Sequence, residues 1–529
     1  MDTKALRQKI LDLAIRGKLV PQDPNDEPAS VLLERIRAEK QQMVKDGKLK
    51  AKDIKNDTVI YKADDNLHYE KFQDGTVKCI EDEIPFDVPE GWAWCRLNAL
   101  LTVCSSKRVL QSEWKKEGIP FYRAREIVKL SENGYVDNEL FISEEYYRQL
   151  NAEYGVPKAG DLMVSGVGTI GKVYVVQKND CFYYKDASVL CFENRTGAIL
   201  SEYARYMLES EFIQRQMKEK SKGTTVDTIT ISTAMMYLCV LPPLKEQFRI
   251  ISTVENSLKY VSSINDNKND LMTLISHAKS KILDLAIRGK LVPQDPNDEP
   301  ASVLLERIRA EKEELIKQGK IKRDKKEPVI FKGDDNSYYL KTGTLEESLD
   351  GWGFDNLPES WEICCLGEVC DYGNCINIDT SDIADNEWIL DLEDIEKDTG
   401  IVIQKVKKRE RNSVSTKHKF HSGQVLYSKL RPYLNKVVLA DDDGYCTSEI
   451  LPLEFNSIIV PEYARYYLMS NTFLAYANCC SYGVKMPRIA TKDWKKAIIP
   501  APPVSEQKRI TKAIKTCFTQ LDKIAETLS

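Results

Sequence analysis

The densest group of chemically active side chains in this sequence lies between Ile401 and Lys436. The stretch holds ten lysine and arginine residues against a single acid, Glu410. Lysine and arginine neutralise phosphate groups, and arginine also forms paired hydrogen bonds with the edge of a guanine base. The composition therefore favours contact with nucleic acid, although a solvated charged face would look the same. The candidate contacts from this stretch are Lys405, Lys407, Arg409, Arg411, Lys417, Lys419, Lys429 and Arg431.

These cations are expected to make two kinds of contact. Lys429 and Arg431 follow a predicted β-strand and should approach the major groove. Lys485 and Arg488, in the segment Gly-Val-Lys-Met-Pro-Arg, should contact a base or the backbone. Phosphates should be held by Arg409, Arg411, Lys417 and Lys419.

The first half of the chain has a more dilute set of candidates, because acids such as Glu113, Glu117 and Glu126 lie among its cations. We expect this half to contact nucleic acid as well, through the cations and the hydroxyl side chains of its predicted loops. The candidates are Lys107, Arg108, Arg123, Arg125, Ser165, Thr169, Lys172, Lys222, Thr224 and Thr225.

Motifs for catalysis or cofactor binding are weak. Residues 166–171 spell Gly-x-Gly-x-x-Gly, but the β-branched and aromatic run after them predicts a hairpin rather than the helix that a dinucleotide site needs. The cysteines near Cys364 and the two histidines His418 and His421 lack metal-ligand spacing. The sequence has no methyltransferase motif of the Asn/Asp-Pro-Pro-aromatic type and no convincing nuclease carboxylate set. We predict no catalytic residue, no metal and no cofactor on this chain.

The amino-acid composition indicates which general type of protein this is. The chain has 529 residues, a net charge of −5, 42% hydrophobic and 30% charged residues, and 14 cysteines without a regular framework. No apolar run approaches the roughly 20 residues of a membrane helix, and the start MDTKALRQKI is unlike a secretory signal. Reduced thiols and a cytoplasmic location are expected.

An internal repeat organises the elements that must position these residues. Residues 9–40 and 281–312 are identical, and weaker echoes follow in the same order in both halves. The first is 59–66 against 329–336, the next is Pro89-Glu-Gly-Trp92 against Pro358-Glu-Ser-Trp361, and each half later contains a Pro-Pro pair followed by Glu-Gln. Between these anchors the halves differ almost everywhere. The chain is therefore a tandem duplication with a fixed frame and two divergent inserts.

Periodicity predicts the fold class as mixed α/β (α+β), with two globular domains and long conserved helices. Apolar spacing predicts helices at 3–16 and about 29–46, a helix without Gly or Pro from about 244 to 288, and a C-terminal helix with an a/d stripe. Residues 505–528 and 3–16 together match 245–268 and 275–288. The termini should therefore lie antiparallel beside the central helix as a coiled-coil spacer, in a pseudo-two-fold repeat with termini like those of a circular permutation. Residues 48–83 are expected to form an extended connector with one strand at 58–61.

The chain resembles the specificity (S) subunit of Type I restriction–modification systems. The resemblance rests on the repeated KILDLAIRGKLVPQ block, the two Pro-Pro-Leu/Val-x-Glu-Gln-x-Arg-Ile helix starts, and the insert motifs GDLMVS and GQVLYSKLRPY. It implies two target-recognition domains, each binding one half of a split, asymmetric DNA site. It also implies docking of two modification (methyltransferase) subunits and, through them, restriction (endonuclease/translocase) subunits. S-adenosylmethionine would then be bound by the methyltransferase partner, and ATP and Mg by the restriction partner.

On this interpretation the chain has five segments. They are an N-terminal helical region (1–55), target-recognition domain 1 (84–243), a central helical region (244–330), target-recognition domain 2 (352–501) and a C-terminal helix (502–529). The repeated blocks, within 4–47 and 276–319, should each contact one modification subunit, because identical surfaces suit two copies of one partner. A coiled-coil adaptor that presents two protein-binding domains remains the alternative, and a DNA-modifying enzyme is a third hypothesis.

Overall fold

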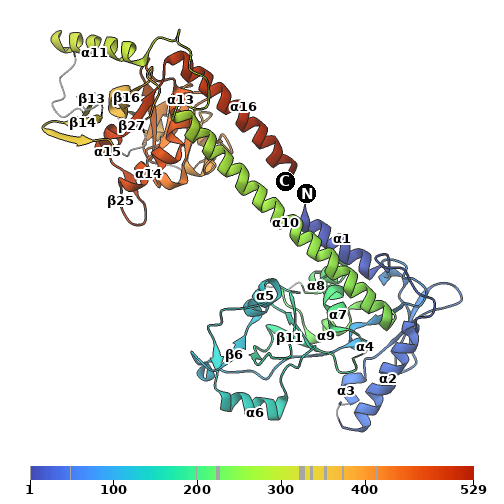
Figure 1. The fold of residues 1–529 in the computed structure, drawn as a ribbon. Helices are drawn as coiled ribbons and strands as arrows, with labels where there is room; N and C mark the ends of the chain where they lie inside the picture. Colours follow the sequence, from blue (N-terminus) through green and yellow to red (C-terminus); the bar gives the residue numbers. More distant parts are fainter. Residues whose placement is uncertain are drawn as a thin grey trace. The chain divides into compact units, whose positions relative to one another are not determined.

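The computed structural model describes residues 2–47, 49, 51–197, 199–221, 227–320, 328–333, 337–350, 354, 356–371, 375–411 and 414–528. The chain divides into two compact units, Met1–Asn267 and Lys268–Ser529, and the division falls inside the 44-residue helix α10 (Leu244–Ile287) (Figure 1). The predicted mixed fold class, with two domains that a long helix separates along the sequence, is confirmed. The five-segment division stays a prediction.

Unit 1 combines two helices from the repeated block with an insert of short strands. Its helices are α1 (Thr3–Ile15), α2 (Ala29–Lys45), α3 (Ala51–Ile54), α4 (Leu97–Leu100), α5 (Ala124–Asn133), α6 (Glu144–Tyr154), α7 (Ser201–Glu209), α8 (Glu211–Lys220) and α9 (Ile231–Met235). Its strands are β1 (Val59–Lys62), β2 (His68–Lys71), β3 (Val77–Cys79), β4 (Ala93–Arg96), β5 (Thr102–Cys104), β6 (Ile119–Tyr122), β7 (Phe141–Ile142), β8 (Leu162–Ser165), β9 (Val173–Val175), β10 (Tyr183–Tyr184), β11 (Val189–Glu193) and β12 (Leu238–Leu241).

Unit 2 repeats this plan with different residues. Its helices are α11 (Ala301–Lys317), α12 (Leu366–Val369), α13 (Pro461–Leu468), α14 (Asn471–Cys479), α15 (Thr491–Lys496) and α16 (Val504–Leu528). Its first strands are β13 (Pro328–Lys332), β14 (Tyr338–Thr342), β15 (Leu345–Ser348), β16 (Glu362–Cys365), β17 (Cys370–Asp371), β18 (Ile376–Ile378), β19 (Ile389–Leu390) and β20 (Lys417–Phe420). The others are β21 (Val425–Ser428), β22 (Val437–Leu439), β23 (Gly444–Thr447), β24 (Ile450–Phe455), β25 (Ser481–Tyr482), β26 (Arg488–Ile489) and β27 (Ile498–Ala501).

The central sheets of the two units have the same topology. The order is β5-β11-β8-β9 in unit 1 and β17-β24-β21-β22 in unit 2, with every neighbouring pair antiparallel. Each unit also has a two-stranded pair, β4–β12 or β16–β27, that leads into its long helix. Each unit also has a smaller sheet, β10-β6-β7 in unit 1 and β18-β20-β23-β19 in unit 2, and the one in unit 2 packs against the central sheet through a small core. The two inserts therefore share a central sheet and differ in the smaller strands and helices around it.

The segment between residues 48 and 83 holds more structure than its sequence predicts. It forms a three-stranded antiparallel sheet, β1-β2-β3, rather than an extended connector with one strand. Only β1 was predicted. The counterpart sheet in unit 2 is β13-β14-β15.

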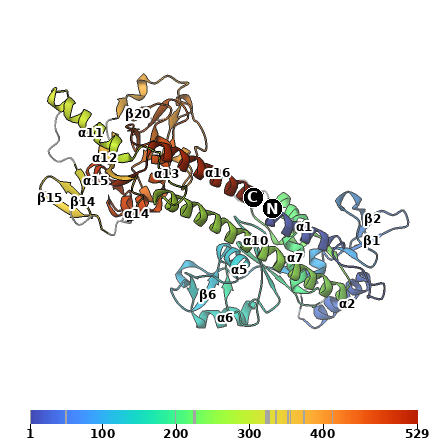
Figure 2. The ribbon, with the colours of Figure 1, turned by 45° about the horizontal axis from the view of Figure 1, so that its top comes forward.

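Each long-helix pair is antiparallel inside its own unit. In unit 1, the hydroxyl of Thr3 on α1 hydrogen-bonds the side-chain oxygen of Asn265 near the far end of that part of α10 (3.3 Å). In unit 2, Lys279 on α10 binds Asp522 on α16 (2.5 Å) and lies over the ring of Phe518 (5.3 Å). Both views of the ribbon show α1 and α16 beside the respective parts of α10 (Figures 1 and 2). The predicted antiparallel arrangement is confirmed within each unit.

A buried glutamine joins each recognition domain to its long helix. The Oε1 atom of Gln247, at the start of α10, accepts a hydrogen bond from the Leu200 amide (2.8 Å), and its Nε2 donates to the Pro242 carbonyl (3.1 Å). Gln507, at the start of α16, makes the matching bonds to Val460 (2.7 Å) and Pro502 (2.8 Å). Because both glutamines are fully buried, these bonds form away from competing water. The glutamine of the repeated Glu-Gln pair thus joins the recognition domain to the long helix, and we call this contact the glutamine latch.

The other anchors of the repeat meet at a tight backbone approach. Gly17 has φ +64°, and a Cβ atom there would lie 2.3 Å from Cγ of Pro89. Gly289 and Pro358 repeat this approach, at φ +67° and 2.4 Å. Only glycine fits such a position. The repeated Gly and the repeated Pro-Glu-x-Trp motif are therefore two sides of one contact, which ends α1 in unit 1 and α10 in unit 2.

The cysteine thiols differ in burial, and therefore in reactivity. All 14 cysteines are free, and of these Cys79, Cys181 and Cys479 are exposed. Burial raises the pKa of Cys95 to about 12, and it raises the pKa of Cys364 well above its usual value. Because the thiolate is the reactive form, buried thiols are poor nucleophiles at neutral pH.

We therefore expect the native chain to react quickly with an aromatic disulfide reagent at the three exposed cysteines. Partly exposed thiols should follow slowly, and the buried ones should react only after unfolding. Mass mapping of the modified peptides checks this order, and the same reaction in guanidinium should count 14 thiols. A lower count would reveal disulfides and contradict the reduced state.

Candidate nucleic-acid interface

Two segments that are far apart in the sequence meet at one edge of unit 2. The connection between β21 and β22 (residues 429–436) lies against the β25–β26 hairpin (residues 481–489). The amide of Arg431 donates to the Pro487 carbonyl (2.7 Å), and the amide of Ile489 donates to the Lys429 carbonyl (3.3 Å). Leu430 and Arg488 form a β-bridge between the segments. We call residues 429–436 and 481–489 the loop pair of unit 2. It brings together Lys429, Arg431, Lys485 and Arg488, all candidates from the sequence.

Arg431 stands at a strained position of this loop pair. Its φ is +50°, in the left-handed region that non-glycine residues seldom occupy. Its Nε atom is buried and has no hydrogen-bond partner among the described residues. Asn435, also left-handed at φ +48°, ties the loop to the body by donating to the Met469 carbonyl (3.1 Å). Backbone strain held in place by surrounding structure is typical of functional positions.

Arg488 supports the hairpin through its guanidinium group. Its Nη2 and Nε donate to the carboxylate of Glu449 (2.7 and 3.1 Å), and its Nη1 donates to the Met486 carbonyl (3.2 Å). The hydrogen bonds from Arg488 hold the pKa of Glu449 below its usual value. These contacts give Arg488 a role in holding the hairpin, and its contact with DNA stays a prediction. Glu449 is a residue that sequence reasoning missed.

Two of the predicted phosphate ligands are structural. The side chain of Arg411 is 9% exposed and binds Asp391 (2.8 Å) and the fully buried Asp394. The side chain of Lys417 is 2% exposed, with its Nζ 3.2 Å from the Ser415 hydroxyl. A cation this deeply enclosed does not reach a phosphate without breaking its internal contacts. For Arg411 and Lys417 the phosphate prediction is therefore corrected.

The other cations of the run remain near the surface. Lys405 lies over the Trp388 ring (4.6 Å) and binds Asp441 (2.9 Å). Lys407, Arg409 and Lys419 are exposed. Lys429 is half-buried beside His418, where burial first and then the Lys429 charge lower the pKa of the histidine. These five residues stay candidates for DNA contact, together with Arg431 and the exposed Lys485.

Unit 1 contains the same two-segment arrangement. The connection between β8 and β9 (residues 166–172) lies against residues 227–229, and the two are joined by a bridge between Val167 and Thr228. The amide of Ile229 donates to the Gly166 carbonyl (2.9 Å). We call residues 166–172 together with residues 221 and 227–229 the loop pair of unit 1. The predicted hairpin at the Gly-x-Gly-x-x-Gly motif is confirmed, because β8 and β9 pair antiparallel.

The first-half candidates fall into three groups. Ser165 is buried and pins the turn: its hydroxyl donates to the Thr169 carbonyl (2.6 Å) and accepts from the Lys172 amide (2.9 Å). Its predicted DNA contact is corrected to this internal role. Thr169 is exposed in the loop pair, and Lys172 there binds Glu132 (2.7 Å). The candidates Lys222, Thr224 and Thr225 lie outside the described residues.

The remaining first-half candidates lie away from the turn. Arg123 and Arg125 both bind the buried carboxylate of Glu126 (2.9 and 3.0 Å), and Arg125 also binds Glu139 (2.8 Å). Arg123 thereby fixes the start of α5. Lys107 lies over the ring of Tyr154 (5.2 Å), and Arg108 is exposed. No described contact ties these cations to the loop pair of unit 1.

Equivalent positions in the two loop pairs carry different residues. Ser165 matches Ser428, each preceding its loop, and Gly168 at φ +77° matches Arg431. Gly171 at φ +77° matches Asn435 in the same way. The second segments also align, since Ser221, Gly223 and Ile229 match Ser481, Gly483 and Ile489 at the spacing set by the Pro-Pro anchors. This register is a sequence signal that could have located both loop pairs.

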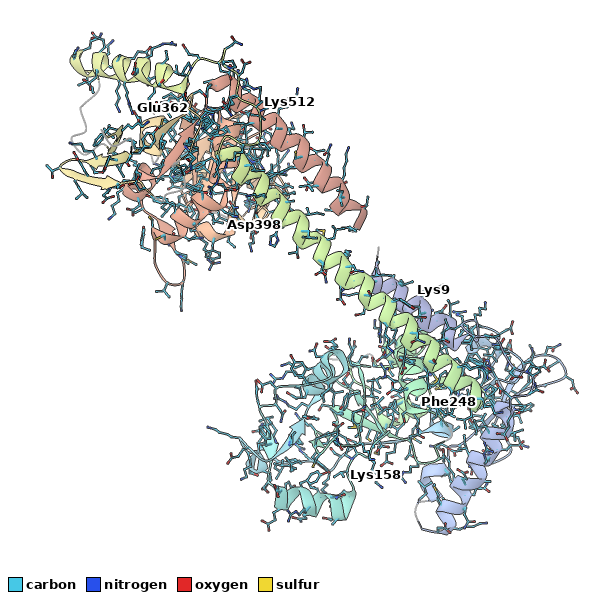
Figure 3. All side chains as sticks on the ribbon, in the orientation of Figure 1. Lys9, Lys158, Phe248, Glu362, Asp398 and Lys512 are labelled. Carbon is cyan, nitrogen blue, oxygen red and sulfur yellow. The ribbon has the colours of Figure 1, made fainter. Side chains whose placement is uncertain are left out.

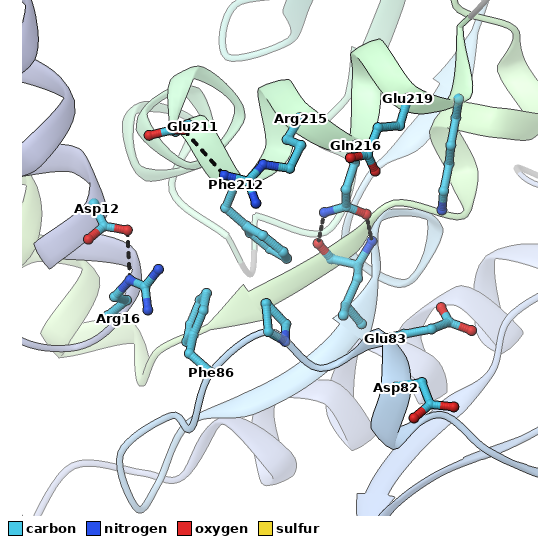
Figure 4. A pocket seen from close by; sticks show the side chains of 13 residues that line it. Asp12, Arg16, Asp82, Glu83, Phe86, Glu211, Phe212, Arg215, Gln216 and Glu219 are labelled. Carbon is cyan, nitrogen blue, oxygen red and sulfur yellow. Dashed lines mark hydrogen bonds and ion pairs between the residues drawn. The ribbon is translucent and has the colours of Figure 1, made fainter.

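A pocket of about 520 Å³ lies elsewhere in unit 1, between α1 and α8 (Figure 4). Arg16 stacks over the ring of Phe86 (4.4 Å) and binds Asp12 (2.6 Å). Acids outnumber cations in its lining, which contains neither serine, cysteine nor histidine. This pocket offers no attacking nucleophile of those types and no cationic cradle for phosphate. Among the described residues, no group of three or more His, Cys, Asp and Glu side chains could hold a metal, and no helix is long and apolar enough to cross a bilayer.

Comparison with known proteins identifies the family. Residues 89–273 and 358–528, which together make up more than half of the chain, match the model of the Type I restriction modification DNA specificity domain. The chain is 28% identical over 425 residues to the Type I restriction enzyme EcoEI specificity subunit of Escherichia coli, with 69% of this chain and 61% of that protein covered. It is 29% identical over 414 residues to the EcoAI specificity subunit of the same species, with 70% and 63% covered.

The chain therefore spans less than two-thirds of the length of these relatives. A solved structure described as showing complex assembly and conformational transition of the type I R-M system has the same fold. It aligns with a TM-score of 0.52 at 17% identity, over 84% of this chain and 94% of that one. Each of the two family matches contains one loop pair of the kind described above. The chain belongs to the family of Type I restriction modification DNA specificity domains.

Proposed function

We propose that the chain is the DNA-specificity subunit of a Type I restriction–modification complex, and that it binds a split, asymmetric DNA site with its two recognition domains. Each loop pair would contact one half of the site. The observation that carries this proposal is the repeated loop pair, which has the same backbone connections in both units and different side chains at matching positions. A common scaffold with different contact residues suits two different half-sites.

Two copies of one partner would dock on the duplicated block. The block is identical in sequence, and several of its cations are exposed in both units, although α2 buries Leu32, Ile36 and Lys40 whereas α11 buries Leu305, the counterpart of Leu33. The side chains of Lys9 (labelled in Figure 3) and Lys281 are 67% and 68% exposed, and those of Arg35 and Arg307 are 49% and 54% exposed. Identical exposed surfaces favour two copies of a single protein. The proposed occupants are methyltransferase subunits, with restriction subunits joining through them.

Catalysis would then belong to the partners. S-adenosylmethionine would be bound by the methyltransferase subunits, and ATP and Mg by the restriction subunits. This chain's own share would be to choose the DNA sequence and to hold the partners in place. The arrangement would operate in the cytoplasm, where the host DNA is found.

Methylation mapping tests the proposal directly. Genomic DNA from cells that express this chain with its modification subunit would be compared with DNA from cells that express the modification subunit alone. A split, asymmetric methylated motif that depends on this chain is the expected result. A stable complex of the two proteins without any chain-dependent methylation would instead favour the protein-binding adaptor.

Salt dependence provides a second test. Binding of a specific duplex by the complex should weaken steeply as salt rises, with a slope of about −0.9 in log–log terms for each phosphate neutralised. Replacing Lys407, Arg409 and Lys419 by alanine should each reduce that slope by about one. Arg411 is predicted not to act as a phosphate ligand, so it is left out of this series.

The matched control is Lys341→Ala on β14, a half-exposed lysine that binds Glu346. Its slope should equal that of the unmodified chain. Equal slopes for the control and all three variants would remove these cations from the interface.

A further inference from the structure

The tip of the β25–β26 hairpin exposes apolar side chains that the fold does not use. Val484 is fully exposed, Met486 is half-exposed, and Tyr482 at the start of the turn is 60% exposed. The connection after β25 stands out from the body of unit 2 in Figure 1. Side chains this exposed contribute nothing to the core, and a cluster of them usually marks a binding surface.

The base of the same hairpin is firmly held. Ile489 is buried, Arg488 is clamped by Glu449, and the Pro487 carbonyl accepts the Arg431 amide. Gly483 closes the turn at φ +97°, where a Cβ atom would lie 3.2 Å from the Met486 carbonyl oxygen. The fixed base holds the exposed apolar side chains of the tip in a defined position before any ligand binds, which is how pre-organised binding sites are built.

Charge around the tip suits a nucleic-acid ligand. No acidic residue lies between Ser481 and Ile489, and Lys485 stands between the two apolar side chains. The neighbouring loop adds Lys429 and Arg431. The nearby Glu449 is neutralised by Arg488. The apolar tip is therefore surrounded by positive charge, which draws it toward phosphates.

We infer that Val484 and Met486 contact bases in the major groove and recognise the C5-methyl group of thymine. This inference rests on the proposed DNA-binding function. Among the base edges of the major groove, the thymine methyl is the apolar group, so an apolar side chain selects it. Arg431, tied to the same hairpin through its backbone, is suited to the acceptors of a neighbouring guanine. The half-site bound by unit 2 therefore contains at least one A·T pair recognised through its methyl group.

The test is a double-mutant cycle between protein and DNA. The complex of this chain with its modification subunit would be titrated with duplexes in which deoxyuridine replaces each thymine of the mapped site, one at a time. At one thymine of the half-site bound by unit 2, loss of the methyl should weaken binding by the unmodified chain about fourfold, the value of one buried methyl group. With Val484→Ala or Met486→Ala, the same replacement should have no further effect.

Control variants and control duplexes distinguish loss of the methyl contact from a general effect of the substitutions or of deoxyuridine. Val329→Ala changes a valine of β13 that is 44% exposed, and the methyl effect should persist in it. Deoxyuridine in the other half-site should act equally in all variants. Because Val484 is fully exposed, its replacement should leave the melting temperature unchanged.

Three outcomes would overturn the inference. One is a half-site of unit 2 made only of G·C pairs, and another is a deoxyuridine effect that adds to the variants at every position. The third is weaker assembly of Val484→Ala or Met486→Ala with the modification subunit in the absence of DNA, which would assign the tip to that protein. If the unmodified complex shows no sequence-specific binding at all, the proposed function itself fails.

Discussion

Replacing Arg96 by methionine is expected to lower the free energy of unfolding of unit 1 by about 3–5 kcal/mol, the usual cost of removing one partner of a buried ion pair. Arg96 is 3% exposed, and its Nη2 binds the buried Glu70 (2.6 Å) and the partly exposed Glu83 (2.9 Å). Methionine fills a similar volume but leaves the Glu70 charge without its partner. Denaturant titration, with hydrogen exchange at β4 and β12, would measure the loss in unit 1 and use unit 2 as an internal reference.

Unit 2 supplies the matched control for this change. At the positions equivalent to Glu70 and Arg96 it has Leu340 and Cys365, and at the position of Thr58 it has Pro328. The same scaffold therefore folds with residues that carry no charge at these three positions. The triple change Thr58→Val, Glu70→Leu and Arg96→Met should return the stability to within about 1 kcal/mol of the unmodified chain, because no charge is left unpaired. A triple variant as unstable as Arg96→Met would show that the loss comes from packing.

The loss of unfolding free energy caused by Arg96→Met should also depend on pH. Burial alone would raise the pKa of Glu70, but the hydrogen bonds from Arg96 and Thr58 more than offset it and hold the pKa below its usual value. A lowered pKa in the folded state gives stability that is present above the pKa of unfolded glutamate, about 4.3, and is lost as the pH falls through the folded pKa. The difference between the two chains should therefore be largest near pH 7 and shrink at acid pH. A constant difference would point away from the ion pair.

Replacing Arg431 by glycine is expected to relax recognition of one base pair in one half-site, by about 1–3 kcal/mol of discrimination. Glycine is chosen because unit 1 has Gly168 at the equivalent position and because φ is positive there. The change removes the guanidinium while relieving backbone strain, so unit 2 should be as stable as before or slightly more stable. Methylation mapping would show a degenerate position within the half-site of unit 2.

Arg409→Ala is the contrasting variant for this experiment. Arg409 is exposed on the cationic stretch, so its loss should weaken binding of all sequences alike. An unchanged motif and affinity with Arg431→Gly would mean that the Arg431 side chain does not recognise a base. A collapse of unit 2 stability would instead assign Arg431 a structural role.

Local signals in the sequence were enough to predict most of the scaffold. Residues 244–288, without glycine or proline, were predicted as one helix, and α10 covers Leu244–Ile287. The glycines of residues 166–171 were predicted to form a hairpin, and they do. Such features depend on backbone preferences within a short window, which a sequence displays directly.

The candidate site was harder to predict, because charge pairing depends on contacts between distant residues. The run of ten cations holds one acid in sequence, but Asp391, Asp394 and Asp441 reach it from flanking segments and engage Arg411 and Lys405. Strands β2 and β3 were also missed, since their polar residues lack the apolar alternation that marks a half-buried strand in a sequence. In both cases the prediction failed because the interacting residues, an acid for each cation and a neighbouring strand for each strand, come from other parts of the chain.

The glutamine latch described at the start of each long helix has a consequence for inheritance. Among the described residues, Gln247 and Gln507 hydrogen-bond to backbone groups alone, in the recognition domain and in the adjoining Pro-Pro pair. A backbone amide or carbonyl is offered by almost any residue, so the joint places little demand on the side chains of the domain it holds. A gene segment that encodes an insert with the same scaffold but different surface residues would therefore keep this attachment after recombination. The frame can stay constant over generations while the inserts diversify, which is the pattern that the two halves of this chain display.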